Sequence, residues 1–78
     1  MRQKQLRLIT TFHTTADALL CEKVCKEQNM EGRMIPVPRQ LSSGCGLAWC
    51  CGPEEEGRFA DFLREKQVEY DAMQVILF

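Results

Sequence analysis

One cysteine of this 78-residue chain stands between two glycines, Gly44 and Gly46, in the segment PVPRQLSSGCGLAWCC (residues 36–51). Glycines allow backbone conformations that other residues avoid, and they leave the side chain of Cys45 with little cover. A thiol in this setting is poorly placed to fill a core. A thiolate is the reactive form of cysteine, so we predict that Cys45 is the focus of function.

A thiolate is stabilised by positive charge and by N–H donors, and several groups could supply them here. Arg39 carries a charge, His13 titrates near neutral pH, and Gly44 and Gly46 offer backbone amides. A helix that begins just after His13 would add the positive end of its dipole. The alternative is that the glycines only form a tight hairpin, that His13 bonds to the backbone, and that Arg39 is a solvated loop charge.

Two further cysteines, Cys50 and Cys51, are adjacent in an apolar run that is typical of a strand, so their side chains should point to opposite faces. On one interpretation, one of them lies under the helices as a small buried side chain and the other faces outside; on the other, one of them resolves a sulfenate or disulfide at Cys45. Zinc bound by His13, Cys45, Cys50 and Cys51 is a third alternative, but the short paired spacings of structural zinc sites do not occur. We therefore predict no metal and no cofactor.

Composition restricts the class of protein. Ten basic and eleven acidic residues give a net charge of −1, which provides no basic field for nucleic acid. The start, MRQKQLRLITTF, lacks the features of a signal peptide, and no segment reaches transmembrane length, so we expect no membrane association and a cytoplasmic location. Five cysteines cannot pair completely. The length predicts one small domain over residues 1–78 with a thin core.

The elements that must position these residues follow from the hydrophobic pattern. In the first helix, Leu20, Cys21, Val24 and Cys25 share the apolar side, which predicts that both of these cysteines are core residues. Thr14 followed by Asp17 is typical of a helix start. The predicted elements are strands over 5–12, 33–37, 47–51 and 69–78 and helices over 15–28 and 53–66.

The order β-α-β-β-α-β predicts an α+β fold, a ferredoxin-like sandwich with a four-stranded antiparallel sheet and two helices on one face. In this topology the first strand ends at the same end of the sheet where the second strand turns into the third. His13, the start of the first helix and the loop of Cys45 should therefore lie close together, about one interstrand spacing apart plus the reach of the loop.

Two runs, TFHTTADAL (11–19) and GRMIPVPRQLSSGCGLAW (32–49), resemble a family of small selenium/sulfur carrier-like proteins. The most specific part spans Ile35 to Ala48. The resemblance implies a ferredoxin-like or similar sandwich and the movement of sulfur or selenium as a cysteine-bound species. Relatives are expected to carry an arginine near Cys50, where this chain has a second thiol. The positions that match the family pattern are Phe12, His13, Thr14, Thr15, Pro38, Arg39, Ser42, Ser43, Gly44, Cys45, Gly46 and Leu47.

The resemblance adds Thr14 and Ser43 to the residues expected around the thiolate. Our first hypothesis is a carrier that binds sulfur or selenium on Cys45 and works with donating and accepting proteins, without turnover of its own. The alternatives are a non-catalytic module that binds a ligand or protein, and a small thiol redox protein that pairs Cys45 with Cys50 or Cys51. The apolar C-terminal strand leaves a homodimer open.

Overall fold

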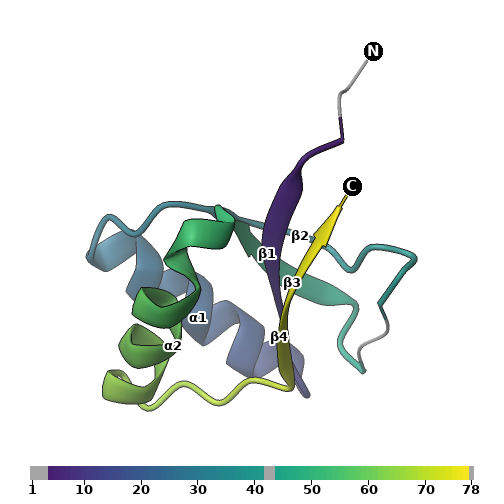
Figure 1. Cartoon of the computed structure of the whole chain (residues 1–78). Helices are drawn as coiled ribbons and strands as arrows, with labels where there is room; N and C mark the ends of the chain where they lie inside the picture. Colours follow the sequence, from purple (N-terminus) through teal and green to yellow (C-terminus); the bar gives the residue numbers. More distant parts are fainter. Residues whose placement is uncertain (1–3, 42–43, 78) are drawn as a thin grey trace.

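The computed structural model describes residues 4–41 and 44–77, and its elements follow the predicted order (Figure 1). The second helix differs at its start, because the segment Pro53–Glu55 after Gly52 forms a 3₁₀ turn and the α-helix begins only at Glu56. The elements are β1 (Leu6–Thr11), α1 (Thr15–Glu27), β2 (Arg33–Pro36), β3 (Leu47–Cys51), α2 (Glu56–Glu65) and β4 (Ala72–Leu77).

The four strands form one antiparallel sheet in the order β2-β3-β1-β4. Thr11 at the end of β1 pairs with Ala48 in β3, and Leu47 pairs with Pro36 at the end of β2. Both helices lie on one side of this sheet, while the loop between β2 and β3 extends on the other side (Figure 1). The arrangement is ferredoxin-like, as the sequence predicts.

The helix ends follow from local side chains and backbone conformation. Thr14 caps α1, because its hydroxyl accepts the backbone N–H of Asp17 at 3.1 Å. The helix ends before Asn29, which has a φ of 55°, and the N–H of Met30 bonds back to the carbonyl of Cys25 at 2.9 Å. Among the described residues, neither helix has the length and apolar character needed to cross a bilayer.

Side chains from the sheet and both helices form a helix-side core. Cys21 and Cys25 are fully buried in it, as predicted, and the ring of Trp49 stacks on Phe59 with centroids 6.4 Å apart. The expectation for Leu20 is wrong: its side chain is 39% exposed, because Ala18 and Cys21 supply the buried contacts of that helical turn. The helix-side core consists of Leu8, Phe12, Ala18, Cys21, Cys25, Trp49, Cys51, Phe59, Leu63 and Val68.

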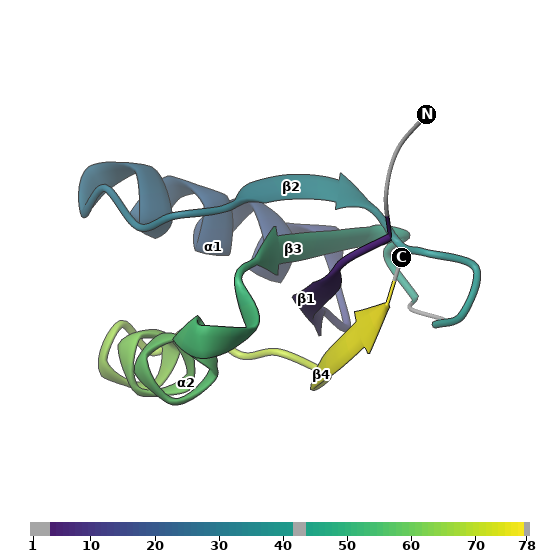
Figure 2. The same cartoon turned by 45° about the horizontal axis from the view of Figure 1, so that its top comes forward.

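The opposite face of the sheet carries a second buried group, which we call the open-face cluster. Its fully covered members are Ile9, Ala48 and Cys50. Val37 and Leu41, from the loop after β2, pack against them. The loop thus provides the cover that no helix gives on this side, and Figure 2 shows it at the end of the sheet remote from α2.

Gly32 and Gly57 make a matched pair for a first prediction. An added Cβ at Gly32, where φ is +128°, would lie 2.5 Å from Nε1 of Trp49 and 2.6 Å from the backbone oxygen of Cys50, whereas at Gly57 in α2 it would meet open space. We expect Gly32→Ala to lower the free energy of unfolding by more than about 2 kcal/mol, and Gly57→Ala to raise it by about 0.5 kcal/mol. Urea denaturation followed by circular dichroism measures both. Equal effects of the two substitutions would contradict the packing described for Gly32.

Candidate functional site

The loop that carries Cys45 is closed at its base and bent by a glycine. The N–H of Val37 donates to the carbonyl of Gly46 at 3.0 Å, which joins the two ends of the loop next to β2 and β3. Gly46 has a φ of +74°, in the left-handed region that side chains disfavour. The glycine that follows Cys45 is therefore a conformational requirement of the turn into β3.

Gly44 brings the same loop against the turn between β1 and α1. A Cβ added at Gly44 would lie 3.2 Å from the backbone carbonyl oxygen of His13, so a side chain there would crowd that turn. His13 directly precedes Thr14, the cap of α1. The structure thus places the Gly-Cys-Gly segment and the start of the first helix at the same end of the sheet, as the predicted topology requires.

The thiol of Cys45 lies between the core and the surface. Cys45 is partly buried, and its side chain packs against the helix-side core. The backbone N–H of Leu47 donates to Sγ of Cys45 at 3.4 Å, and Sγ lies 3.5 Å from the carbonyl oxygen of Leu47. The sulfur therefore has a fixed position, with a backbone amide directed at it, and one side that is not covered by the core.

His13 has a partner that the sequence analysis missed. Its Nε2 lies 3.7 Å from Oδ1 of Asp71, and the two side chains are 61% and 40% exposed. Asp71 immediately precedes β4, and its backbone N–H donates to the carbonyl of Thr11 at 2.7 Å, which fixes it beside the end of β1. The sequence analysis started the final strand at residue 69 and so placed Asp71 inside it. The topology alone would place the start of that strand beside the end of β1.

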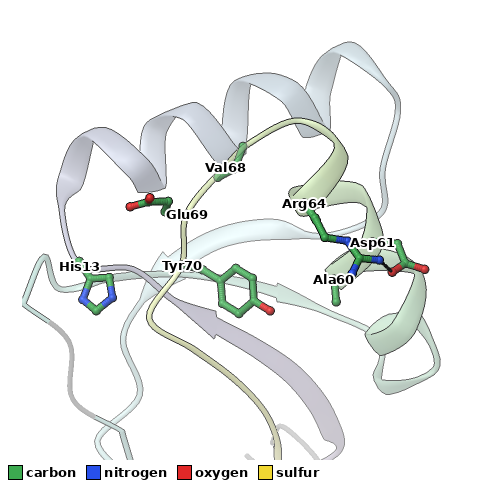
Figure 3. A pocket seen from close by; sticks show the side chains of 7 residues that line it. All are labelled: His13, Ala60, Asp61, Arg64, Val68, Glu69 and Tyr70. Carbon is green, nitrogen blue, oxygen red and sulfur yellow. Dashed lines mark hydrogen bonds and ion pairs between the residues drawn. The ribbon is translucent and has the colours of Figure 1, made fainter.

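An open groove of about 500 Å³ begins at His13. Figure 3 shows the imidazole at one end of the groove, Arg64 and Asp61 on α2 at the other, and the ring of Tyr70 between them. Arg64 is already bound by Asp61, with Nη2 2.6 Å from Oδ1. The groove is lined by His13, Ala60, Asp61, Arg64, Val68, Glu69 and Tyr70.

The structure describes two of the other residues predicted around the thiolate, Thr14 and Arg39. The hydroxyl of Thr14 caps the helix and so fixes the turn that Gly44 contacts. Arg39 is exposed on the loop, and its contribution to the site stays a prediction. Ser43 and Ser42 lie outside the described residues. The structure therefore assembles Gly44, Cys45, Gly46 and the backbone of His13 and Thr14.

Cys50 and Cys51 point to opposite faces, as predicted. Cys51 belongs to the helix-side core and Cys50 to the open-face cluster, and they are 7% and 5% exposed. The expectation that one of them faces outside is therefore wrong, because partly buried apolar side chains pack over the open-face cluster. Burial, followed by the nearby Cys50 and Glu55, raises the pKa of Cys51 from 9.0 to about 12. From Leu47 to Cys50 the strand advances by about 10 Å, beyond the spacing that a disulfide allows, so a Cys45–Cys50 bridge would require β3 to move.

The zinc alternative gains no support from this geometry. Cys50 and Cys51 are separated by the sheet, and Cys45 lies before the strand that carries them. Within residues 4–41 and 44–77, the side chains that come together in a group of three metal-ligand types are Glu31, Glu54 and Glu55. Two of these carboxylates are exposed, and such groups are common on surfaces without an ion.

Differences in burial predict the order in which the five thiols react. Under native conditions we expect iodoacetamide to modify Cys45 about 100-fold faster than the other four, because those react only when the fold opens locally. Peptide mass spectrometry after timed alkylation measures each site, and alkylation in urea should make the rates similar. Native labelling of Cys50 or Cys51 as fast as that of Cys45 would contradict the burial described here.

The raised pKa of Cys51 predicts how stability depends on pH. Since this thiol loses its proton at lower pH in the unfolded chain than in the fold, its stabilising contribution is complete below about pH 9 and is lost as pH rises toward about 12. Urea denaturation at about pH 8 and about pH 10 should show a fall on the order of 1 kcal/mol. Cys51→Ala should make that fall smaller, and an unchanged pH slope in this variant would contradict the assignment to Cys51.

Comparison with known proteins bears on the identity of the chain. The family model described as "Putative Se/S carrier protein-like" matches residues 7–74, which include both β1 and the Gly-Cys-Gly segment. Comparison with curated proteins and with solved structures found no match. Because the model spans almost the whole sequence, the chain belongs to the Se/S carrier protein-like family.

Proposed function

We propose that this protein carries sulfur or selenium on Cys45 and exchanges it with donating and accepting proteins. The observation that supports this most directly is the position of the thiol: it is partly buried, receives a backbone N–H from Leu47 at 3.4 Å, and lies between two glycines. Gly44 and Gly46 give the neighbouring backbone no side chains, which leaves room for a partner to approach the sulfur.

The chemistry needs only this sulfur and a partner. The Cys45 thiolate attacks the outer sulfur of a donor persulfide, R–S–SH. A bond forms between Sγ and that sulfur, the S–S bond of the donor breaks, and the donor leaves as the thiolate R–S⁻. The product is Cys45–S–SH, and a second exchange passes the terminal atom to an acceptor. The N–H of Leu47 can bond to Sγ throughout the attack, because an ionised sulfur is a better hydrogen-bond acceptor than a neutral thiol.

The structure favours this proposal over the redox alternative. A dithiol redox site needs two cysteines whose Cα atoms can approach to within about 7 Å. The candidates to resolve a bond at Cys45 are buried, Cys50 in the open-face cluster and Cys51 in the helix-side core. A carrier needs one accessible thiol, and Cys45 is the cysteine that the structure leaves partly exposed.

Transfer to Cys45 can be tested directly by mass spectrometry. After incubation with a persulfide donor and then with a selenium donor, followed by gel filtration, the intact protein should gain the mass of one sulfur or one selenium atom. Peptide analysis should place it on Cys45. Cys45→Ser should abolish the gain, because the hydroxyl is too weak a nucleophile to attack the donor.

Cys50→Ala provides the matched control, since it also removes a thiol but leaves the loop glycines and Cys45 in place. We expect this variant to load as the parent protein does. A gain in mass that persists in Cys45→Ser, or a Cys45 that stays unmodified while still reacting with iodoacetamide, would exclude the carrier function and leave the binding module.

A further inference from the structure

We propose that His13 and Asp71 form a proton-donating pair for the thiol that leaves when Cys45 accepts its cargo. In this assignment His13 is the group that contacts the leaving sulfur, and Asp71 is a positioning residue that keeps a carboxylate beside the imidazole. The inference rests on the proposed function at Cys45 and adds a role for two groups at its margin.

The first argument is position. Gly44 precedes the nucleophile, and a Cβ added to it would lie 3.2 Å from the backbone carbonyl oxygen of His13, so the backbone of the residue that bears the imidazole adjoins the loop that bears the thiol. In thiol exchange the three sulfurs lie in line, which puts the leaving sulfur about 4 Å beyond Sγ, two S–S bond lengths away. A proton donor for that atom must stand beside the loop, where His13 is, and needs no contact with Sγ.

The second argument is the fixed partner of the imidazole. Oδ1 of Asp71 lies 3.7 Å from Nε2 of His13. The backbone of Asp71 is anchored by its 2.7 Å hydrogen bond to Thr11, the last residue of β1. A histidine beside a carboxylate is a recurring arrangement for proton transfer to and from sulfur or oxygen. Both side chains are exposed enough to meet a partner.

The third argument is space. The groove that starts at His13 is open and large enough for the residues around a donor cysteine, with the ring of Tyr70 as an apolar wall (Figure 3). Glu69 also lines it, so a protonated imidazole has a second carboxylate in its surroundings. The leaving thiol would lie at the His13 end of this groove.

The proposed step balances. The Cys45 thiolate attacks R–S–SH, the bond from Sγ to the terminal sulfur forms, and the electron pair of the broken S–S bond stays on R–S⁻. The imidazolium of His13 gives its proton to R–S⁻, which departs as R–SH, and the neutral imidazole remains beside Asp71. In delivery the neutral ring can take the proton of the acceptor thiol. No external oxidant or reductant takes part.

A comparison of two disulfides tests this role, because proton donation matters only when the leaving thiol is basic. Oxidised glutathione releases an alkyl thiolate, whereas a nitrobenzoate disulfide releases an aromatic thiolate that is stable at neutral pH. Mixed-disulfide formation at Cys45 is followed with each. We expect His13→Gln to slow the reaction with oxidised glutathione about 100-fold and to change the reaction with the aromatic disulfide less than about threefold.

Asp71→Asn and Glu65→Gln complete the design. We expect Asp71→Asn to slow the reaction with oxidised glutathione about tenfold and to change the reaction with the aromatic disulfide little, because its backbone hydrogen bond to Thr11 remains. This variant keeps the test valid if circular dichroism shows that His13→Gln is misfolded. Glu65 is exposed on α2 and does not line the groove, so removal of its charge should leave both reactions unchanged.

Equal slowing of both disulfides by His13→Gln would show a structural or purely electrostatic effect and would overturn the proposal, as would no effect on either. An Asp71→Asn variant that behaves as the parent protein would remove Asp71 from it. Since these reagents do not require Cys45 to hold a sulfur atom, failure of the carrier function and failure of the proton-donating pair give different results.

Discussion

The close approach of Gly44 to the backbone carbonyl of His13 places the loop of Cys45 beside the start of α1. It brings the loop between β2 and β3 against the turn that follows β1, and these two segments are more than 30 residues apart in the sequence. The antiparallel sheet makes the contact available, because β1 ends at the level where β2 and β3 are joined. Because Gly44 has no side chain, the loop can approach the carbonyl of His13 closely.

The remaining constraints on Cys45 act in different directions. Gly46 bends the backbone into β3, Leu47 directs its amide at the sulfur, and Leu41 holds the loop on the open face of the sheet. Together they keep one thiol at the boundary between core and solvent, while the other four cysteines are buried by ordinary packing. The backbone around Cys45 thus keeps this thiol partly exposed, in contrast to the four cysteines of the cores.

The sequence predicted the fold because the fold depends on strong local signals. Alternation and helical periodicity identified the strands and helices, Thr14 marked the start of α1, and the strand order followed from the β-α-β-β-α-β topology. The adjacent residues Cys50 and Cys51 were correctly assigned to opposite faces, since strand geometry leaves no other arrangement.

What the sequence did not reveal depends on tertiary contacts. Leu20 fits the apolar side of α1 by periodicity, but the side of the helix that packs in the fold is the one with Ala18, Cys21 and Cys25. Val68 is buried because Gln67 ends α2 with a φ of 60° and the N–H of Val68 bonds to the carbonyl of Leu63, a motif with no glycine to signal it. Asp71 is one exposed carboxylate among eleven acidic residues, and only its approach to His13 distinguishes it.

The position of Leu41 has a consequence for recognition. In a sandwich whose helices cover one face of the sheet, the other face is available to bind another macromolecule. Here Val37 and Leu41 already occupy part of that area, and they belong to the same short segment that presents the sulfur. A partner that binds to this side would therefore contact the segment between β2 and β3, which also holds Cys45, so its binding and the exposure of that thiol depend on one segment of the chain.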